Sequence, residues 1–261
     1  MRNILFGCLI FLLPGCINEN AQPIYLKQEV RSQSPRRILS HDEGTWQYFL
    51  QNLPVLNGPI LNYRGQPISH QSKNAGIINY DVGSQDLQQC ADALIRLRSE
   101  YLFQQKSYNE IGFHFTNGDF YSWKDYSKGK RPEVKGNKVK YYQTNNSELS
   151  YKNLRSYLDI VYAYAGTISV ANELKDAKDF SVGTVIITPG SPGHCCIIID
   201  ETVSGENKKF YKLVEGFTPA QSIYIVSNPY DKEISPWYQL KKGNISTSSY
   251  QFRNYLLKKF E

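Results

Sequence analysis

The chain has 261 residues, 41% of them hydrophobic, and a formal net charge of +6 at pH 7. This length and apolar content allow a full hydrophobic core and exclude a disordered chain. The positive charge is too small and too dispersed to indicate a nucleic-acid-binding protein, so no nucleic acid is expected as a partner.

The N-terminus predicts an exported lipoprotein. Arg2 precedes an apolar stretch over residues 4–13, which closes at Leu13-Pro14-Gly15-Cys16. This order is typical of a signal peptide, here residues 1–15, and the stretch is shorter than the roughly 20 residues that a membrane-spanning helix needs. A cysteine directly after the small residue resembles the lipobox of bacterial lipoproteins. The resemblance implies that Cys16 receives the lipid and anchors the chain to a membrane of the cell envelope, on the periplasmic or outer-surface side.

Residues 16–44 are polar and show no sustained period, so we expect a flexible tether. A single domain is predicted over residues 45–261. It begins with a short amphipathic helix over residues 45–50, and a strand is expected over residues 77–82.

Residues 84–102 have the strongest helical pattern in the chain, with Ser84 or Asp86 as the expected cap. Cys90 lies on its inward face within the first two turns. There the positive end of the helix dipole can lower a thiol pKa, as a nucleophile requires. A core cysteine in an amphipathic helix has the same pattern, so both interpretations stand at this point.

The middle of the chain predicts a strand over residues 111–115 and a long loop or irregular hairpin over residues 124–149. Between residues 124 and 140 this segment carries seven cations against two acids. We expect it to contact an anionic surface or polymer, although a solvated loop has the same composition. Helices are predicted over residues 150–165 and onward to 174.

The last third of the chain reads as β-structure, with short strands expected over residues 182–188, 193–200, 209–215 and 222–226. A final amphipathic helix is expected over residues 249–260. Helices followed by an antiparallel meander indicate an α+β fold, with helices packed on an antiparallel sheet. No nucleotide-binding glycine pattern and no metal-ligand spacing occurs in the sequence, so no cofactor and no metal are expected.

Three cysteines follow Cys16, namely Cys90, Cys195 and Cys196. An odd number cannot pair completely within the chain, so a disulfide framework is not expected. Cys195 and Cys196 are adjacent in a predicted strand, and their side chains should therefore point to opposite faces as small apolar fillers.

His194 follows a Pro/Gly-rich turn and opens a continuous apolar run, which holds its ring rigidly at the edge of a sheet and suits a general base. Asp200 lies about 20 Å away along the same strand and is a poor partner. A hairpin turn at residues 203–207 returns the next strand antiparallel and brings the region of Glu215 to Phe217 opposite His194, where Glu215 is the only ionisable residue. We therefore predict Cys90 as nucleophile, His194 as base and Glu215 as the group that orients the ring.

Gln221 is the reserve orienting residue, and backbone N–H groups at the helix start are the expected oxyanion donors. The alternative remains that Glu215 is an ordinary carboxylate at a strand end, with the thiol and the imidazole apart. A hydrogen-bonded histidine at the edge of the core would be equally compatible with the pattern.

Several spaced motifs resemble a bacterial family called domain of unknown function 4846, from about residue 45 to the C-terminus. They are Asp86-Leu87-Gln88-Gln89-Cys90-Ala91-Asp92-Ala93, Arg96-Leu97-Arg98-Ser99-Glu100-Tyr101, Pro192-Gly193-His194, Pro219-Ala220-Gln221, Asn228-Pro229 and Ser235-Pro236-Trp237-Tyr238. The resemblance implies exported lipoproteins without an assigned activity. The family pattern has larger aliphatic residues in place of Cys195 and Cys196, and a glutamine in place of Glu215.

The order of a cysteine at a helix start and a histidine at the head of an apolar strand is also similar to papain-like cell-wall hydrolases of the NlpC/P60 and CHAP type. This resemblance implies a cysteine amidase or peptidase that acts on peptidoglycan or another envelope polymer. The alternative is a non-catalytic envelope lipoprotein that binds glycan or a partner protein through its aromatic surface.

The lipobox resemblance generates the first testable prediction. Replacement of Cys16 by serine removes the acceptor of the lipid, so the protein is expected to move from the membrane fraction to the soluble fraction. Fractionation of cells that express either form checks this. Unchanged membrane association of the Cys16→Ser protein would show that lipid does not anchor the chain.

Overall fold

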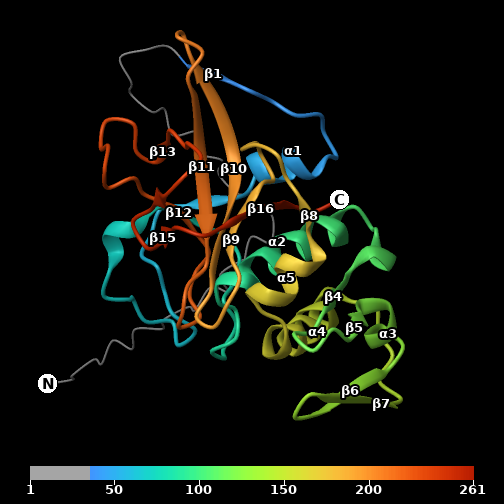
Figure 1. Ribbon diagram of the computed structural model, residues 1–261. Coiled ribbons are helices and arrows are strands. Elements are labelled where there is room, and N and C mark those ends of the chain that lie inside the picture. The colour runs from blue at the N-terminus through green and yellow to red at the C-terminus, as the bar shows by residue number, and fades with distance from the viewer. Residues whose placement is uncertain (1–35) are drawn as a thin grey trace, which may run out of the picture.

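The structure, a computed structural model, describes residues 36–261 (Figure 1). The predicted signal peptide, Cys16 and most of the predicted tether lie outside this range. Within it, no helix is long and apolar enough to cross a membrane.

A large antiparallel sheet forms the centre of the fold. Its main path runs in the order β2 (Val55–Leu56), β3 (Asn74–Ile78), β12 (Tyr224–Val226), β11 (Lys209–Glu215), β10 (His194–Ser204), β9 (Val185–Thr188), β16 (Leu256–Lys259) and β8 (Lys175–Asp176). Two further strands join from the side: β1 (Arg36–Ile38) pairs with β10, and β13 (Trp237–Tyr238) pairs with β11.

Five α-helices accompany the sheet in the described part of the chain: α1 (Trp46–Gln51), α2 (Cys90–Gln104), α3 (Trp123–Ser127), α4 (Tyr151–Tyr164) and α5 (Thr167–Glu173). Two short 3₁₀ helices, η1 (Gln71–Lys73) and η2 (Tyr108–Glu110), lie in connections. Three small hairpins complete the fold: β4 (Gly112–His114) with β5 (Phe120–Ser122), β6 (Lys130–Lys135) with β7 (Lys138–Gln143), and β14 (Ile245–Ser246) with β15 (Gln251–Phe252). These helices and the antiparallel sheet confirm the α+β prediction.

Side chains along β10 point alternately to the two faces of the sheet, and a separate apolar cluster lies on each face. Cys195 and Ile197 belong to the larger cluster, which includes side chains from α1, α2, α4 and α5. Cys196 and Ile198 belong to the smaller cluster on the other face, together with Phe252. The two adjacent cysteines therefore point to opposite faces, as the strand pattern predicts.

Helix α2 begins at Cys90, six residues later than the pattern predicts. Gln89 is its cap, and the Gln89 N–H donates to the Asp92 carboxylate at 3.0 Å. Asp86, expected as a cap, instead accepts a hydrogen bond from the Ala220 N–H at 2.7 Å. Because this contact to a distant loop holds the chain outside the helix, Cys90 becomes the first helical residue.

The predicted C-terminal helix over residues 249–260 is wrong. The segment forms β15 and β16, and Leu256 lies opposite Ile187 of β9. The backbone of this segment pairs with the edge of β9, and this pairing decides its structure against the local amphipathic pattern. As a strand, the segment satisfies its backbone N–H and C=O groups through hydrogen bonds to a distant part of the chain. In the same way β1 pairs with β10, so the sheet takes in residues 36–38 of the predicted tether.

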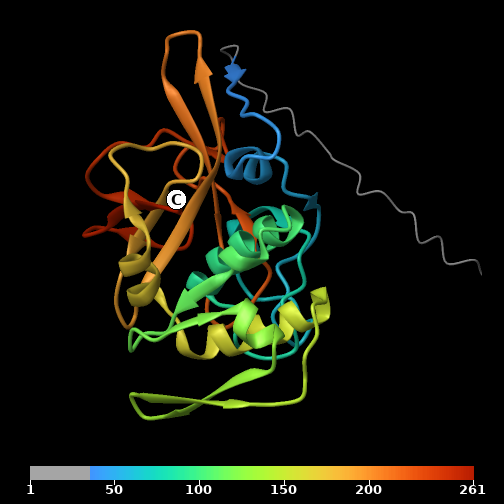
Figure 2. The ribbon, with the colours of Figure 1, turned by 90° about the vertical axis from the view of Figure 1, so that its right-hand side faces the viewer.

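The basic segment over residues 124–149 contains α3 and the hairpin β6–β7, so the hairpin alternative describes it better than a plain loop. The hairpin projects at the end of the molecule opposite β1 (Figures 1 and 2). Lys138 and Lys140 are exposed on its outer face, next to the exposed Tyr142.

A buried polar network fixes α2 and the segment that leads into it. The Arg96 guanidinium is fully buried and contacts the Glu100 carboxylate at 2.6 Å and Asp81 at 3.0 Å. It also donates to the Gln88 side-chain oxygen at 3.0 Å, and Tyr151 of α4 donates to Glu100 at 2.7 Å. The network therefore ties the start of α2, where Cys90 lies, to α4.

Replacement of Arg96 by methionine is expected to destabilise the protein by about 3–5 kcal/mol, because Glu100 would remain buried without its cation. The double variant Arg96→Met/Glu100→Met should regain much of this loss. Chemical denaturation measures both. Lys135→Met is the matched control, since the exposed Lys135–Glu133 pair contributes less than about 1 kcal/mol. An Arg96→Met protein as stable as this control would contradict the role of the network.

Candidate active site

Cys90 lies where the start of α2 meets the turn before β10. Its side chain is half-buried, and its Sγ lies 3.9 Å from the Gly193 carbonyl oxygen. The Ala91 N–H donates to the sulfur. The thiol is therefore both accessible in part and next to the positive end of a helix.

His194 is the first residue of β10 and is almost fully buried. Its Nε2 lies 2.8 Å from Glu215 Oε2, and its backbone pairs with Thr188 of β9. The Cys90 side chain, next to the turn before this strand, raises the pKa of the ring. Because Glu215 occupies Nε2, the nitrogen left for the thiol is Nδ1.

Glu215, the last residue of β11, fixes the imidazole from the side opposite Cys90. One carboxylate oxygen faces His194, and the other accepts hydrogen bonds from the hydroxyl groups of Tyr224 and Ser249. The side chain is fully buried. Three donors thus set the position of the carboxylate, and the carboxylate sets the orientation of the ring.

Hydrogen bonds and neighbouring charges outweigh burial and give the thiol and the imidazole opposite charges at neutral pH. A hydrogen bond from Cys195 is the largest cause that lowers the pKa of Cys90 to about 5, and His194 adds to it against the effect of burial. Burial lowers the pKa of His194, but the hydrogen bonds and charges of Cys90 and Glu215 outweigh it and raise this pKa to about 9. A thiolate–imidazolium pair follows between these two pH values.

The three residues predicted as a catalytic set are thus brought together. Asp200 lies elsewhere and contacts Lys212 at 3.2 Å, in agreement with its rejection as a partner. Gln221 is buried and bridges to Asn62 through its backbone, while Glu215 takes the orienting position.

Several residues of the site escaped the sequence analysis. Cys195 is more than an apolar filler, because hydrogen bonding from its side chain lowers the pKa of Cys90. The ring of His194 packs against Phe217, Tyr250 and Phe252, with ring centroids 5.1, 4.7 and 5.7 Å away. The incorrect helix prediction over residues 249–260 hid Ser249 and Tyr250, and only the position of Phe217 opposite His194 in the hairpin gave a usable signal.

A family model described as a domain of unknown function (4846) matches residues 29–259. The chain belongs to this family. Searches of curated proteins and of solved structures found no match. In this member of the domain of unknown function 4846 family, the chemistry of the site therefore has to be argued from its geometry. Over residues 36–261, no group of three or more His, Cys, Asp or Glu side chains is placed to hold a metal ion.

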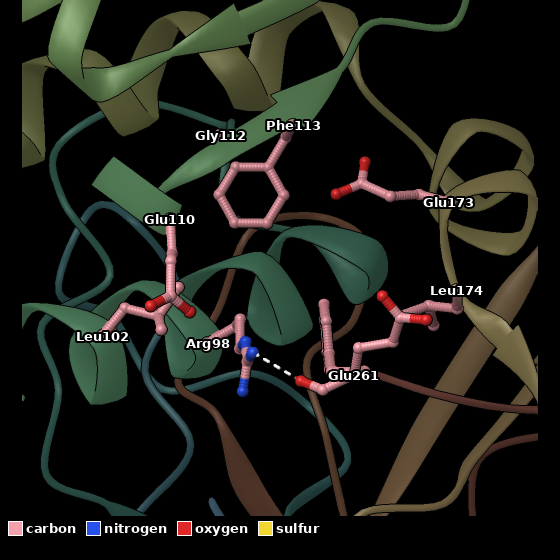
Figure 3. A pocket seen from close by; sticks show the side chains of 9 residues that line it. Arg98, Leu102, Glu110, Gly112, Phe113, Glu173, Leu174 and Glu261 are labelled. Carbon is pink, nitrogen blue, oxygen red and sulfur yellow. Dashed lines mark hydrogen bonds between the residues drawn. The ribbon is translucent and has the colours of Figure 1, made fainter. Parts of the chain in front are cut away.

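A hollow lies near the other end of α2 and is distinct from this site (Figure 3). It has a volume of about 230 Å³, and its lining includes Arg98, Glu110, Phe113 and Glu173. Arg98 is two turns further along the helix than Cys90, a rise of about 12 Å. In Figure 3 its guanidinium donates to the Glu261 carbonyl oxygen, at 2.8 Å.

The charges of the pair generate a pH prediction. Because the lowered pKa of Cys90 is about 5, the rate of alkylation by iodoacetamide should rise through pH 5 and change little from there to pH 8. An ordinary thiol reacts mainly above a pKa of about 8.5. Peptide mass spectrometry follows the modification of Cys90 alone. A midpoint near 8.5 would show that the thiol is not activated.

Proposed function

We propose that this protein is a lipid-anchored cysteine hydrolase that cleaves amide bonds in a polymer of the bacterial cell envelope. The observation that carries the proposal is the position of the Cys90 sulfur, 3.9 Å from the carbonyl oxygen of the residue before His194, while Glu215 holds the His194 ring at 2.8 Å. A partly accessible thiolate, an imidazolium and a fixed carboxylate are the parts that nucleophilic catalysis by cysteine requires. Their order along the chain is similar to that of papain-like hydrolases, which supports the same chemistry by analogy.

The reaction follows from the positions of the groups. The Cys90 thiolate attacks the carbonyl carbon of the amide, and the negative charge moves to the carbonyl oxygen. The Cys90 N–H, which has no acceptor within the helix, is positioned at the helix start to donate to this oxyanion. The imidazolium of His194 then gives a proton to the leaving nitrogen, the C–N bond breaks, and a thioester remains on Cys90.

Water completes the cycle. His194, now neutral, takes a proton from a water molecule that attacks the thioester, and the carboxylic acid product leaves as the C–S bond breaks. The thiolate and the imidazolium are thereby restored. Glu215 holds the imidazole in one orientation during both half-reactions, because its three hydrogen bonds leave it little freedom to turn.

The basic hairpin β6–β7 supports an envelope polymer as the substrate. Lys138 and Lys140 stand exposed beside Tyr142. The hairpin lies at the end opposite β1, through which the predicted tether joins the sheet (Figure 1). A protein held at a membrane by its N-terminus can thus present this surface to an anionic polymer.

Isolated peptidoglycan sacculi provide the substrate for a direct test. The intact protein should release soluble fragments from them, and Cys90→Ala should lower this rate by about 10³-fold or more, because the nucleophile is lost. Cys196→Ala is the matched control, since it makes the same Cys→Ala change at a fully buried residue that faces the opposite cluster. Its activity should be retained. Equal release by the Cys90→Ala and unmodified proteins would sink the proposal.

A further inference from the structure

We propose that Lys73 recognises a carboxylate on the substrate and thereby selects anionic peptides for cleavage at Cys90. This inference rests on the proposed function. It assigns to the site a specificity-determining residue and a substrate class, namely a peptide that carries a free carboxylate close to the scissile amide.

Lys73 is linked to the site through one aromatic ring. Its Nζ lies 4.5 Å from the centroid of the Phe217 ring, whose centroid lies 5.1 Å from that of the His194 ring. Together these distances keep the ammonium within about 10 Å of the imidazole, roughly one Debye length at about 0.1 M ionic strength. An extended peptide covers this span with about three residues.

Two hydrogen bonds hold the backbone of Lys73 in place. Its carbonyl oxygen accepts a hydrogen bond from the Ser227 N–H at 2.7 Å and one from the Ser248 hydroxyl at 3.4 Å. The residue is half-buried. The Phe217 ring below the ammonium contributes a cation–π contact that favours the charged side chain at this position.

The charge of Lys73 is not neutralised by a neighbour in the described part of the chain. No carboxylate of residues 36–261 lies within ion-pair distance of its ammonium. Glu215 is buried and already accepts from His194, Tyr224 and Ser249. A half-buried lysine within about 10 Å of the catalytic imidazole, without an acidic partner, is suited to an incoming carboxylate.

Two small reagents test this without a known substrate. Iodoacetate and iodoacetamide alkylate a thiolate by the same step, in which a C–S bond forms and iodide leaves, but only iodoacetate carries a carboxylate. The full-length protein is treated with each reagent at pH 7 and low salt. The rate of modification of Cys90 is followed by peptide mass spectrometry.

Replacement of Lys73 by methionine should lower the iodoacetate rate about three- to tenfold, in line with the loss of one charge at this distance, and leave the iodoacetamide rate unchanged. Lys73→Arg should keep the iodoacetate rate. Lys138→Met on the distant hairpin, a matched control, should change neither rate. For the protein without substitutions, added salt should lower the rate of reaction with iodoacetate and leave the rate with iodoacetamide unchanged.

Two results overturn the inference in different ways. Equal effects of Lys73→Met on both reagents, or no effect on either, would show that Lys73 does not recognise an anion. Slow reaction of the unmodified protein with both reagents would show that Cys90 is not an activated thiol, and the proposed function would fail with the inference.

Discussion

The hydrogen bond between Glu215 and His194 is the constraint on which the site depends. It exists because β10 and β11 pair antiparallel, with Ile197 opposite Val214, which brings the end of β11 to the start of β10. A carboxylate on Nε2 leaves Nδ1 for the thiol and favours the charged ring. Burial opposes the charged ring, and Glu215 acts together with Cys90 to outweigh it, so that the thiolate has a cation beside it.

Helix α2 supplies the other half of the arrangement. Its first residue is Cys90, and the contact between Asp86 and the loop at Ala220 stops the helix from beginning earlier. The buried Arg96 network then holds the helix against α4. The thiol therefore owes its position to contacts with distant parts of the chain, and these contacts hold it against the head of β10. Cys195, the residue after His194, is the largest cause that lowers the pKa of this thiol.

Much of this site could be predicted from sequence because its key distances are local. A short turn at residues 203–207 forces an antiparallel hairpin, and the period of a strand then fixes which residues oppose His194. The α+β class followed from the order of the elements in the same way. The first residue of α2 could not be predicted in this way, because a contact with a loop more than a hundred residues away determines where the helix begins.

The structure of the C-terminal segment could not be predicted from the sequence either. Its apolar residues fit a helix, and only the free edge of β9 makes them strands. Ser249 and Tyr250 consequently could not be recognised as parts of the site, since their contacts with Glu215 and His194 depend on that pairing. Cys195 was misjudged for a different reason. The alternating pattern of a strand predicts the face on which a side chain lies. It does not predict which residue of another element lies next to that side chain.

The most direct test of the central claim is the protonation state of His194 at pH 7.5. The chain has four histidines, so the ¹⁵N signals of the His194 ring can be assigned by comparison with a His194→Gln variant. The raised pKa of about 9 predicts an imidazolium with protons on both Nδ1 and Nε2. A neutral ring at this pH in the unmodified protein would contradict the thiolate–imidazolium pair on which the account rests.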